Sequence, residues 1–144
     1  TKGTISDLYP NEGYKRSSSN SYALTPIHQS TKYRGSRDDY RIEFTFSSSV
    51  DGDLSFTKLI AFVFGSSQGF VLKGQDCVED PASEVEIEEC WIDEGSRVIW
   101  IRPVVKSTYT NNKKVAIITR DLAIQNPTIS SIDPNDFLVK YYSW

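Results

Sequence analysis

Serine is abundant in this chain, whereas histidine occurs once, as His28. A serine nucleophile needs a histidine base within hydrogen-bond reach and a third group that orients the base. His28 lies between Ile27 and Gln29 in a segment with little periodicity, which makes it a poor candidate for that base. The sequence also lacks the glycine-rich patterns that bind phosphate groups. We therefore expect no catalytic residue and no cofactor, and we expect that the protein is not an enzyme.

Carboxylates concentrate in residues 76–94, a segment that contains no lysine or arginine. Asp76, Glu79 and Asp80 could supply oxygen ligands to a hard cation such as calcium. The segment lacks the alternating spacing around a central glycine of a dedicated calcium loop, so we favour a solvated acidic face. Two cysteines and one histidine are too few for the usual four-ligand zinc site. We expect no metal site.

The opposite charge concentrates in residues 1–37, where Asp7 and Glu12 are the only acids. The cations of this segment are Lys2, Lys15, Arg16, Lys32, Arg34 and Arg37. Oppositely charged patches can pair between neighbouring copies of a chain, and the alternative is two solvated surfaces that do not meet.

The two cysteines, Cys77 and Cys90, have twelve residues between them and flank an acidic loop. We favour a disulfide between them over two free buried thiols. Closing a loop of about 14 residues stabilises a fold by roughly 3 kcal/mol in the chain-entropy model. A lasting disulfide points to an oxidising compartment, so the favoured interpretation predicts an extracellular or cell-surface protein.

Aromatic residues are the remaining candidates for a binding function. Trp91, Tyr141, Tyr142 and Trp144 could form a platform on which sugar rings stack, if several project from one face. The alternative is that they pack at the domain edges or against a neighbouring domain, with Trp100 in the core. We favour packing and keep a carbohydrate-binding module as the second hypothesis.

The composition is that of a globular domain. The chain has 144 residues, a net charge of −3, 38% hydrophobic residues and a mean hydropathy of −0.41. The negative net charge argues against a nucleic-acid partner, and no apolar run is long enough to insert into a membrane. Since the sequence contains no methionine, we expect a mature or excised piece of a longer polypeptide.

Residues 39–144 read as a series of strands. Tyr40–Phe46 alternates apolar and polar residues, which is typical of a strand with one wet face. Leu59–Phe64 and Val98–Ile101 are continuously apolar, so we expect strands buried on both faces in the middle of a sheet. Val85 and Ile87 alternate with Glu84, Glu86 and Glu88, which predicts an edge strand over residues 84–88.

The remaining strands are predicted at residues 70–72, at 115–124 as one long strand or two separated at Asp121, and at 137–142. Seven to eight strands without an amphipathic helix predict an all-β fold, an antiparallel β-sandwich. Residues 1–38 have little pattern beyond short apolar pieces. We expect an extended arm or linker there, followed by one domain at 39–144.

The order of these features resembles the Ig-like repeats of very large secreted and surface proteins of ciliates and related protists. The resemblance covers about residues 38–144 and includes the cysteine pair, the run from Val115 to Pro127 and the closing run Phe137–Tyr142. It implies an Ig-like sandwich, a disulfide between Cys77 and Cys90, and a strand that ends at Asn126-Pro127. It also implies repeats strung in tandem as coats, fibres or adhesive structures.

We therefore expect a non-enzymatic extracellular structural or adhesive module. Its partners would be copies of itself or neighbouring repeats of a larger chain, with glycans as partners under the second hypothesis. Contacts would be made through the N-terminal arm or through the edges of the domain.

Overall fold

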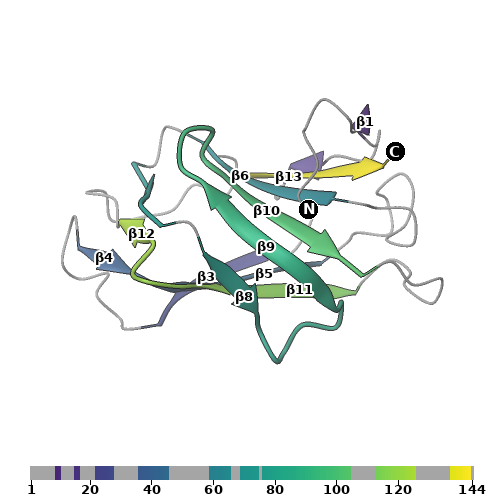
Figure 1. The fold of residues 1–144 in the computed structure, drawn as a ribbon, viewed down its shortest axis with the longest axis horizontal. Helices are drawn as coiled ribbons and strands as arrows, with labels where there is room; N and C mark the ends of the chain where they lie inside the picture. The colour runs from purple at the N-terminus through teal and green to yellow at the C-terminus, as the bar shows by residue number, and fades with distance from the viewer. Residues whose placement is uncertain are drawn as a thin grey trace.

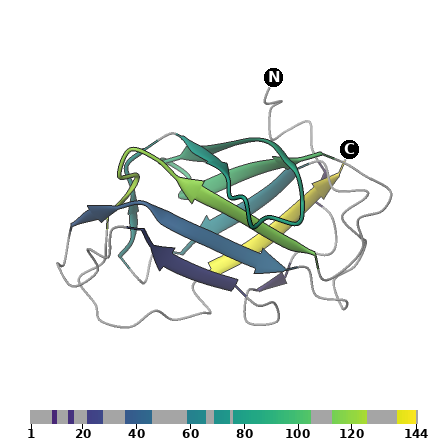
Figure 2. The same cartoon turned by 90° about the horizontal axis from the view of Figure 1, so that it is seen from below.

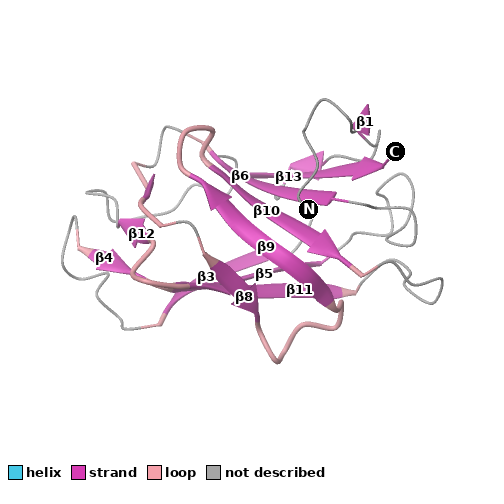
Figure 3. Cartoon of the chain, viewed as in Figure 1, coloured by secondary structure: helices cyan, strands magenta, loops and turns pink. Residues whose placement is uncertain are grey.

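The computed structural model describes residues 9–10, 15–16, 22–27, 36–45, 59–65, 69–74, 76–104, 113–125 and 137–143. Every regular element in this part of the chain is a strand, and every strand pairing is antiparallel (Figure 3). The prediction of an antiparallel all-β fold is confirmed, but the described residues form more strands than the seven to eight predicted.

Thirteen strands occur among the described residues. The first seven are β1 (Tyr9–Pro10), β2 (Lys15–Arg16), β3 (Tyr22–Pro26), β4 (Arg37–Asp38), β5 (Tyr40–Thr45), β6 (Leu59–Phe64) and β7 (Val71–Leu72). The others are β8 (Cys77–Glu79), β9 (Ile87–Asp93), β10 (Val98–Pro103), β11 (Lys114–Thr119), β12 (Ile124–Gln125) and β13 (Phe137–Ser143).

These strands form three sheets. The largest has the order β1-β13-β6-β10-β9, and β2 also pairs with β13. The second has the order β3-β5-β11-β8, and the third is the small sheet β4-β12-β7. Figures 1 and 2 show the first two sheets as separate layers, with β6, β10 and β13 in one and β3, β5 and β11 in the other.

The apolar patterns of the sequence account for the central strands. β6 lies between β13 and β10, and β10 lies between β6 and β9, so both have neighbours on two sides as predicted. In β5, Tyr40, Ile42 and Phe44 are buried while the intervening Arg41 and Glu43 are half-buried. This is the alternation expected of a strand that turns one face to the core.

One apolar cluster joins the sheets. Buried residues of β5 and β11 contact those of β6, β9, β10 and β13, and β7 and β12 contribute Leu72 and Ile124. Phe44 of the second sheet stacks on Phe62 of the first, with 5.9 Å between the ring centroids. Rings with centroids 5.4–6.0 Å apart continue the contact from Phe62 through Phe64 and Phe137 to Phe70. The shared cluster therefore spans both layers.

Two boundary predictions were wrong. Residues 76–94 are not one acidic loop, because β8 and β9 lie within them, joined by residues 80–86. The edge strand is β9, at the edge of the first sheet as predicted, but it begins at Ile87 and not at Glu84. For residues 115–124 the second of the two predicted arrangements is found, because the stretch is divided into β11 and β12, which belong to different sheets. A turn separates them, in which Asp121 and Leu122 have φ angles of 62° and 54°.

The segment 1–38 contributes strands to all three sheets. β1 and β2 pair with β13, β3 pairs with β5, and β4 pairs with β12. β3 is the longest of these and forms the edge of the second sheet. Pieces of the N-terminal segment therefore lie on the strands of residues 39–144 in the same chain.

Candidate functional site

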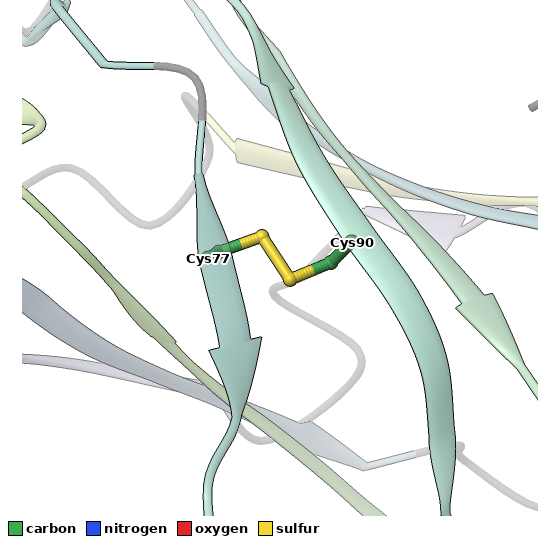
Figure 4. The surroundings of a disulfide bond; sticks show 2 residues. All are labelled: Cys77 and Cys90. Atoms are coloured by element: carbon green, nitrogen blue, oxygen red, sulfur yellow. A yellow bond between two sulfur atoms is a disulfide. The ribbon is translucent and has the colours of Figure 1, made fainter.

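A disulfide joins Cys77 of β8 to Cys90 of β9, with 5.6 Å between the two Cα atoms. Figure 4 shows the two side chains reaching toward each other from neighbouring strands. β8 is the edge of the second sheet and β9 is the edge of the first. The predicted disulfide is confirmed, and it links the two sheets at their adjacent edges.

Two further contacts accompany the disulfide. Asp76 pairs with Trp91 as an isolated antiparallel β-bridge on one side of it. On the other side, the backbone N–H of Ile87 donates to the Glu79 carboxylate. These three links are called the β8–β9 junction below. A groove of about 440 Å³ lies along the junction, lined by the disulfide, Trp91 and several carboxylates.

Most carboxylates of residues 76–94 are exposed, as a solvated acidic face requires, but several of them also bond to other parts of the chain. Asp80 is buried, forms an ion pair with Arg41, and accepts a 2.7 Å hydrogen bond from the backbone N–H of Ala82. Glu84 accepts a 2.8 Å bond from the backbone N–H of Lys114, and Glu89 lies 3.5 Å from the Arg102 guanidinium. Several acids therefore hold strands together.

The sequence contained one signal for the role of Asp80. An aspartate before proline and a small residue is typical of a turn in which the carboxylate accepts a backbone N–H. Here Ser83 N–H donates to the Asp80 carbonyl at 2.9 Å, closing that turn. The ion pair with Arg41 carried no such signal, because the two residues are distant in sequence.

The acids do not converge as metal ligands would. Among the described residues, no three histidine, cysteine, aspartate or glutamate side chains come together in a group that could hold an ion. Asp76, Glu79 and Asp80 all fall within the described part of the chain, so the calcium arrangement considered for them is not formed.

Trp91 and Trp100 stack across the β9–β10 pair, with ring centroids 6.4 Å apart. Trp100 is buried as expected, but it lies in a second, smaller apolar cluster with Leu59, Ala61 and Val98. The Arg102 guanidinium lies 5.9 Å from the centroid of the half-buried Trp91 ring. The ring of Trp91 therefore already has two neighbours from β10.

The other candidate aromatic residues are less fully placed. The backbones of Tyr141 and Tyr142 lie in β13, opposite Ile60 and Leu59 respectively. Their side chains, all of Trp144, and His28 lie outside the described part of the structure. Of the four aromatic side chains suggested for a platform, only that of Trp91 lies in the described part of the structure, so the platform stays a prediction.

Residues 65–69 contain a catalytic spacing that the expectation of no catalytic residue overlooked. Gly65, Ser67 and Gly69 match the Gly-x-Ser-x-Gly pattern of a nucleophile elbow. Such an elbow connects a strand to a helix, whereas this stretch connects β6 to the strand β7. Ser66, Ser67 and Gln68 lie outside the described residues.

Two ionisable groups near these elements have shifted pKa values. Burial, together with the negative charge of Asp38, raises the pKa of Tyr40 to about 12. Hydrogen bonds from the Ser96 side chain and from the backbone of the β9–β10 turn lower the pKa of Asp93 below its ordinary 3.8, against a smaller effect of burial. Neither residue lines the groove, so neither shift indicates acid or base catalysis there.

No family model, no curated protein and no solved structure matches the chain. The described part of the structure contains no helix long and apolar enough to cross a membrane. The resemblance to ciliate surface repeats therefore stays a prediction from the sequence.

Proposed function

We propose that this chain is a non-enzymatic extracellular module with an Ig-like β-sandwich fold, one unit of a surface coat, fibre or adhesive structure. The observation that carries the proposal is the disulfide between the edge strands of two sheets that share one apolar cluster. Such a bond prevents the edges from separating, which suits a unit that bears load outside the cell. It also persists best in an oxidising compartment.

Location gives the first test. A membrane-impermeant amine-reactive label, applied to intact cells that make the protein, should modify it. Non-reducing mass spectrometry of the protein recovered from those cells should find the bond between Cys77 and Cys90. A protein that is protected from the label and carries two free thiols would overturn the extracellular proposal.

Assembly gives the second test. Sedimentation velocity of the purified chain, from micromolar concentration to about 1 mM, should show concentration-dependent association. Deleting residues 1–21 removes β1 and β2 while keeping β3 and β4. If the shortened chain no longer associates, the contact is made by the first segment, and if it still associates, the contact is made by the domain. A chain that sediments as a monomer at every concentration would remove the assembly part of the proposal.

A carbohydrate-binding module is the second candidate, and the observation in its favour is the half-buried Trp91 at the acidic groove. A glycan array distinguishes the two functions. Saturable binding that is lost in Trp91→Ala and largely kept in Trp91→Phe would favour the carbohydrate function, because phenylalanine retains a ring for stacking. The same array tests Tyr142→Ala for a contribution from β13, and no binding at all favours the structural function.

A further inference from the structure

Two large apolar side chains stand out from the described part of the molecule by their exposure, Ile27 at 42% and Leu122 at 43%. They are 95 positions apart in sequence, yet Asp39 accepts a hydrogen bond from Ile27 itself and one from Ala123, the residue that follows Leu122. The backbone N–H of Ile27 donates to the Asp39 carbonyl at 2.8 Å, and the N–H of Ala123 donates to the Asp39 carboxylate at 3.1 Å. The region formed by Ile27, Arg37, Asp39 and residues 120–123 is called the Asp39 end below.

The turn that carries Leu122 is held firmly from several sides. Arg37 donates through Nε to the Leu122 carbonyl at 2.7 Å and through Nη2 to the Asp121 carbonyl at 3.2 Å. The N–H of Lys73 donates to the Ala123 carbonyl at 2.7 Å. Ala123 itself is fully buried, so the chain passes from an exposed leucine to a core position within one residue.

Leu122 is an unfavourable choice for its own turn. Its φ angle of 54° lies in the left-handed region, which glycine and asparagine adopt with less strain than a residue branched beyond Cβ. Arg97 also has a positive φ angle, 61°, but its side chain donates to the Phe64 carbonyl at 3.2 Å. The exposed side chain of Leu122 makes no such bond to a neighbouring strand. The fold therefore keeps a strained backbone conformation and an exposed apolar side chain at the same position.

A residue whose type is unfavourable for its backbone conformation, and whose apolar side chain is exposed to solvent, is typical of a functional contact. We propose that Leu122 and Ile27 form a contact with the Asp39 end of a second copy of this chain, related by a two-fold axis. The neighbouring charges favour a second copy as the partner. Arg120 and Asp121 are adjacent, exposed and opposite in sign, so this surface is self-complementary in charge, and a two-fold arrangement in which each arginine faces the partner's aspartate forms two ion pairs.

This inference deepens the assembly part of the proposed function by naming one surface and its partner. The Asp39 end lies where β4, β12 and the C-terminal end of β3 meet, at the far end of the molecule from the C-terminal end of β13 (Figures 1 and 2). Two apolar side chains on each copy make a small contact, smaller than stable protein interfaces. The association is therefore weak for a single pair of copies and becomes effective when several units are linked.

Sedimentation velocity of Leu122→Asn tests the contact directly. Asparagine suits the left-handed backbone, so the variant should fold at least as well as the natural chain, as judged by circular dichroism and thermal unfolding. We expect its self-association to weaken about tenfold or more, because burial of one leucine on each copy is lost. Ala82→Asn is the matched control, since it adds the same side chain at an exposed turn near the β8–β9 junction, and it should associate as the natural chain does.

A charge exchange tests the two-fold geometry. Arg120→Glu alone and Asp121→Lys alone each place like charges opposite one another in a pair of identical copies, so each should associate about tenfold more weakly. An equimolar mixture of the two variants restores opposite charges at both contacts and should associate like the natural chain.

The outcomes separate this inference from the proposed function. If the natural chain and Leu122→Asn associate equally, another surface drives assembly and the inference is overturned, while the proposed function stands. If the mixture of charge variants associates no better than either variant alone, the two-fold contact is overturned. If the natural chain does not associate at all, both this contact and the assembly part of the proposed function fail.

Discussion

The β8–β9 junction and the Asp39 end both fix the margin of a sheet, but they do so with different bonds and to different effect. At the junction a disulfide, a backbone bridge and a carboxylate bond connect two edge strands. At the Asp39 end, hydrogen bonds from distant parts of the chain converge on Asp39 and on the turn at residues 120–123. The first region closes an edge, and the second holds an apolar side chain outward.

This difference indicates where each region's stability comes from. A covalent link keeps its strength when single hydrogen bonds open, whereas a set of hydrogen bonds depends on the exact approach of the backbones that make them. Changes at the junction should therefore act through the chain entropy of the unfolded state. Changes at the Asp39 end should act through packing and burial in the folded state.

The largest expected effect is loss of the covalent link. The double variant Cys77→Ala and Cys90→Ala should lose about 3 kcal/mol of unfolding free energy, because a loop closed over 13 positions is released in the unfolded state. Equilibrium urea unfolding of the variant and the natural chain gives the difference. Reduction of the natural chain should lower its stability by a similar amount, and a loss below about 1 kcal/mol would show that the other two links suffice.

A matched pair of glycine substitutions compares packing against the Asp39 end with packing in the β9–β10 turn, which lies beyond the junction. A Cβ atom at Gly74 would lie 2.6 Å from the Cβ of Ala123, whereas one at Gly95 would lie 3.6 Å from its nearest neighbour, the Asp93 carboxylate. We expect Gly74→Ala to cost about 2 kcal/mol through overpacking and Gly95→Ala to change stability by less than about 0.5 kcal/mol. Thermal and urea unfolding measure both, and equal effects would mean that the turn at Ala123 can move aside.

Sequence patterns predicted the parts of this fold that depend on local periodicity. Alternation identified β5, and continuous apolar runs identified β6 and β10, because burial on one or two faces directly constrains which residues can follow one another. The cysteine pair was likewise recognised from two residues and their spacing.

The partners of the charged residues could not be predicted from the sequence. The acids around β8 and β9 looked solvent-exposed, and only the folded chain brings Arg41 to Asp80 and the Ile87 N–H to Glu79. The Asp39 end was missed for the same reason, since its partners come from Ile27, Arg37 and the 120–123 turn. A partner supplied from a distant segment leaves no local pattern.

Alkaline pH should destabilise the fold through Tyr40, which follows Asp39 and is buried in the main apolar cluster. Its backbone N–H donates to the Thr119 hydroxyl at 3.0 Å, and burial with the nearby Asp38 raises the pKa of its phenol from 10.0 to about 12. Because the folded-state pKa is the higher one, this group's contribution is complete below pH 10 and is lost as pH rises toward 12. At pH 11 the loss should be on the order of 1 kcal/mol.

Stability measured by urea unfolding at pH 9 and pH 11 tests this effect. Tyr40→Phe has no phenol to ionise, so its stability should fall less between the two pH values than that of the natural chain. Parallel losses in the two proteins would assign the alkaline sensitivity to other groups.

The smallest effect belongs to the turn between β9 and β10, at the end of β9 beyond the junction. The Asp93 carboxylate accepts bonds from the Ser96 hydroxyl and, at 3.3 Å, from the Ser96 N–H, and these lower its pKa below 3.8. Since the folded-state pKa is the lower one, the contribution is present above about pH 4 and disappears as pH falls through the folded value. Asp93→Asn should therefore be slightly less stable than the natural chain at pH 7 and equally stable at about pH 2.

Ser96→Ala removes the hydroxyl donor but keeps the N–H, so it should show part of the same pH-dependent loss. The turn is exposed to solvent, and solvent screening keeps the effect of both variants well below that of Gly74→Ala. A larger loss of stability in Asp93→Asn than in Gly74→Ala would contradict this order. Hydrogen bonding in the exposed β9–β10 turn would then contribute more to stability than close packing at the Asp39 end.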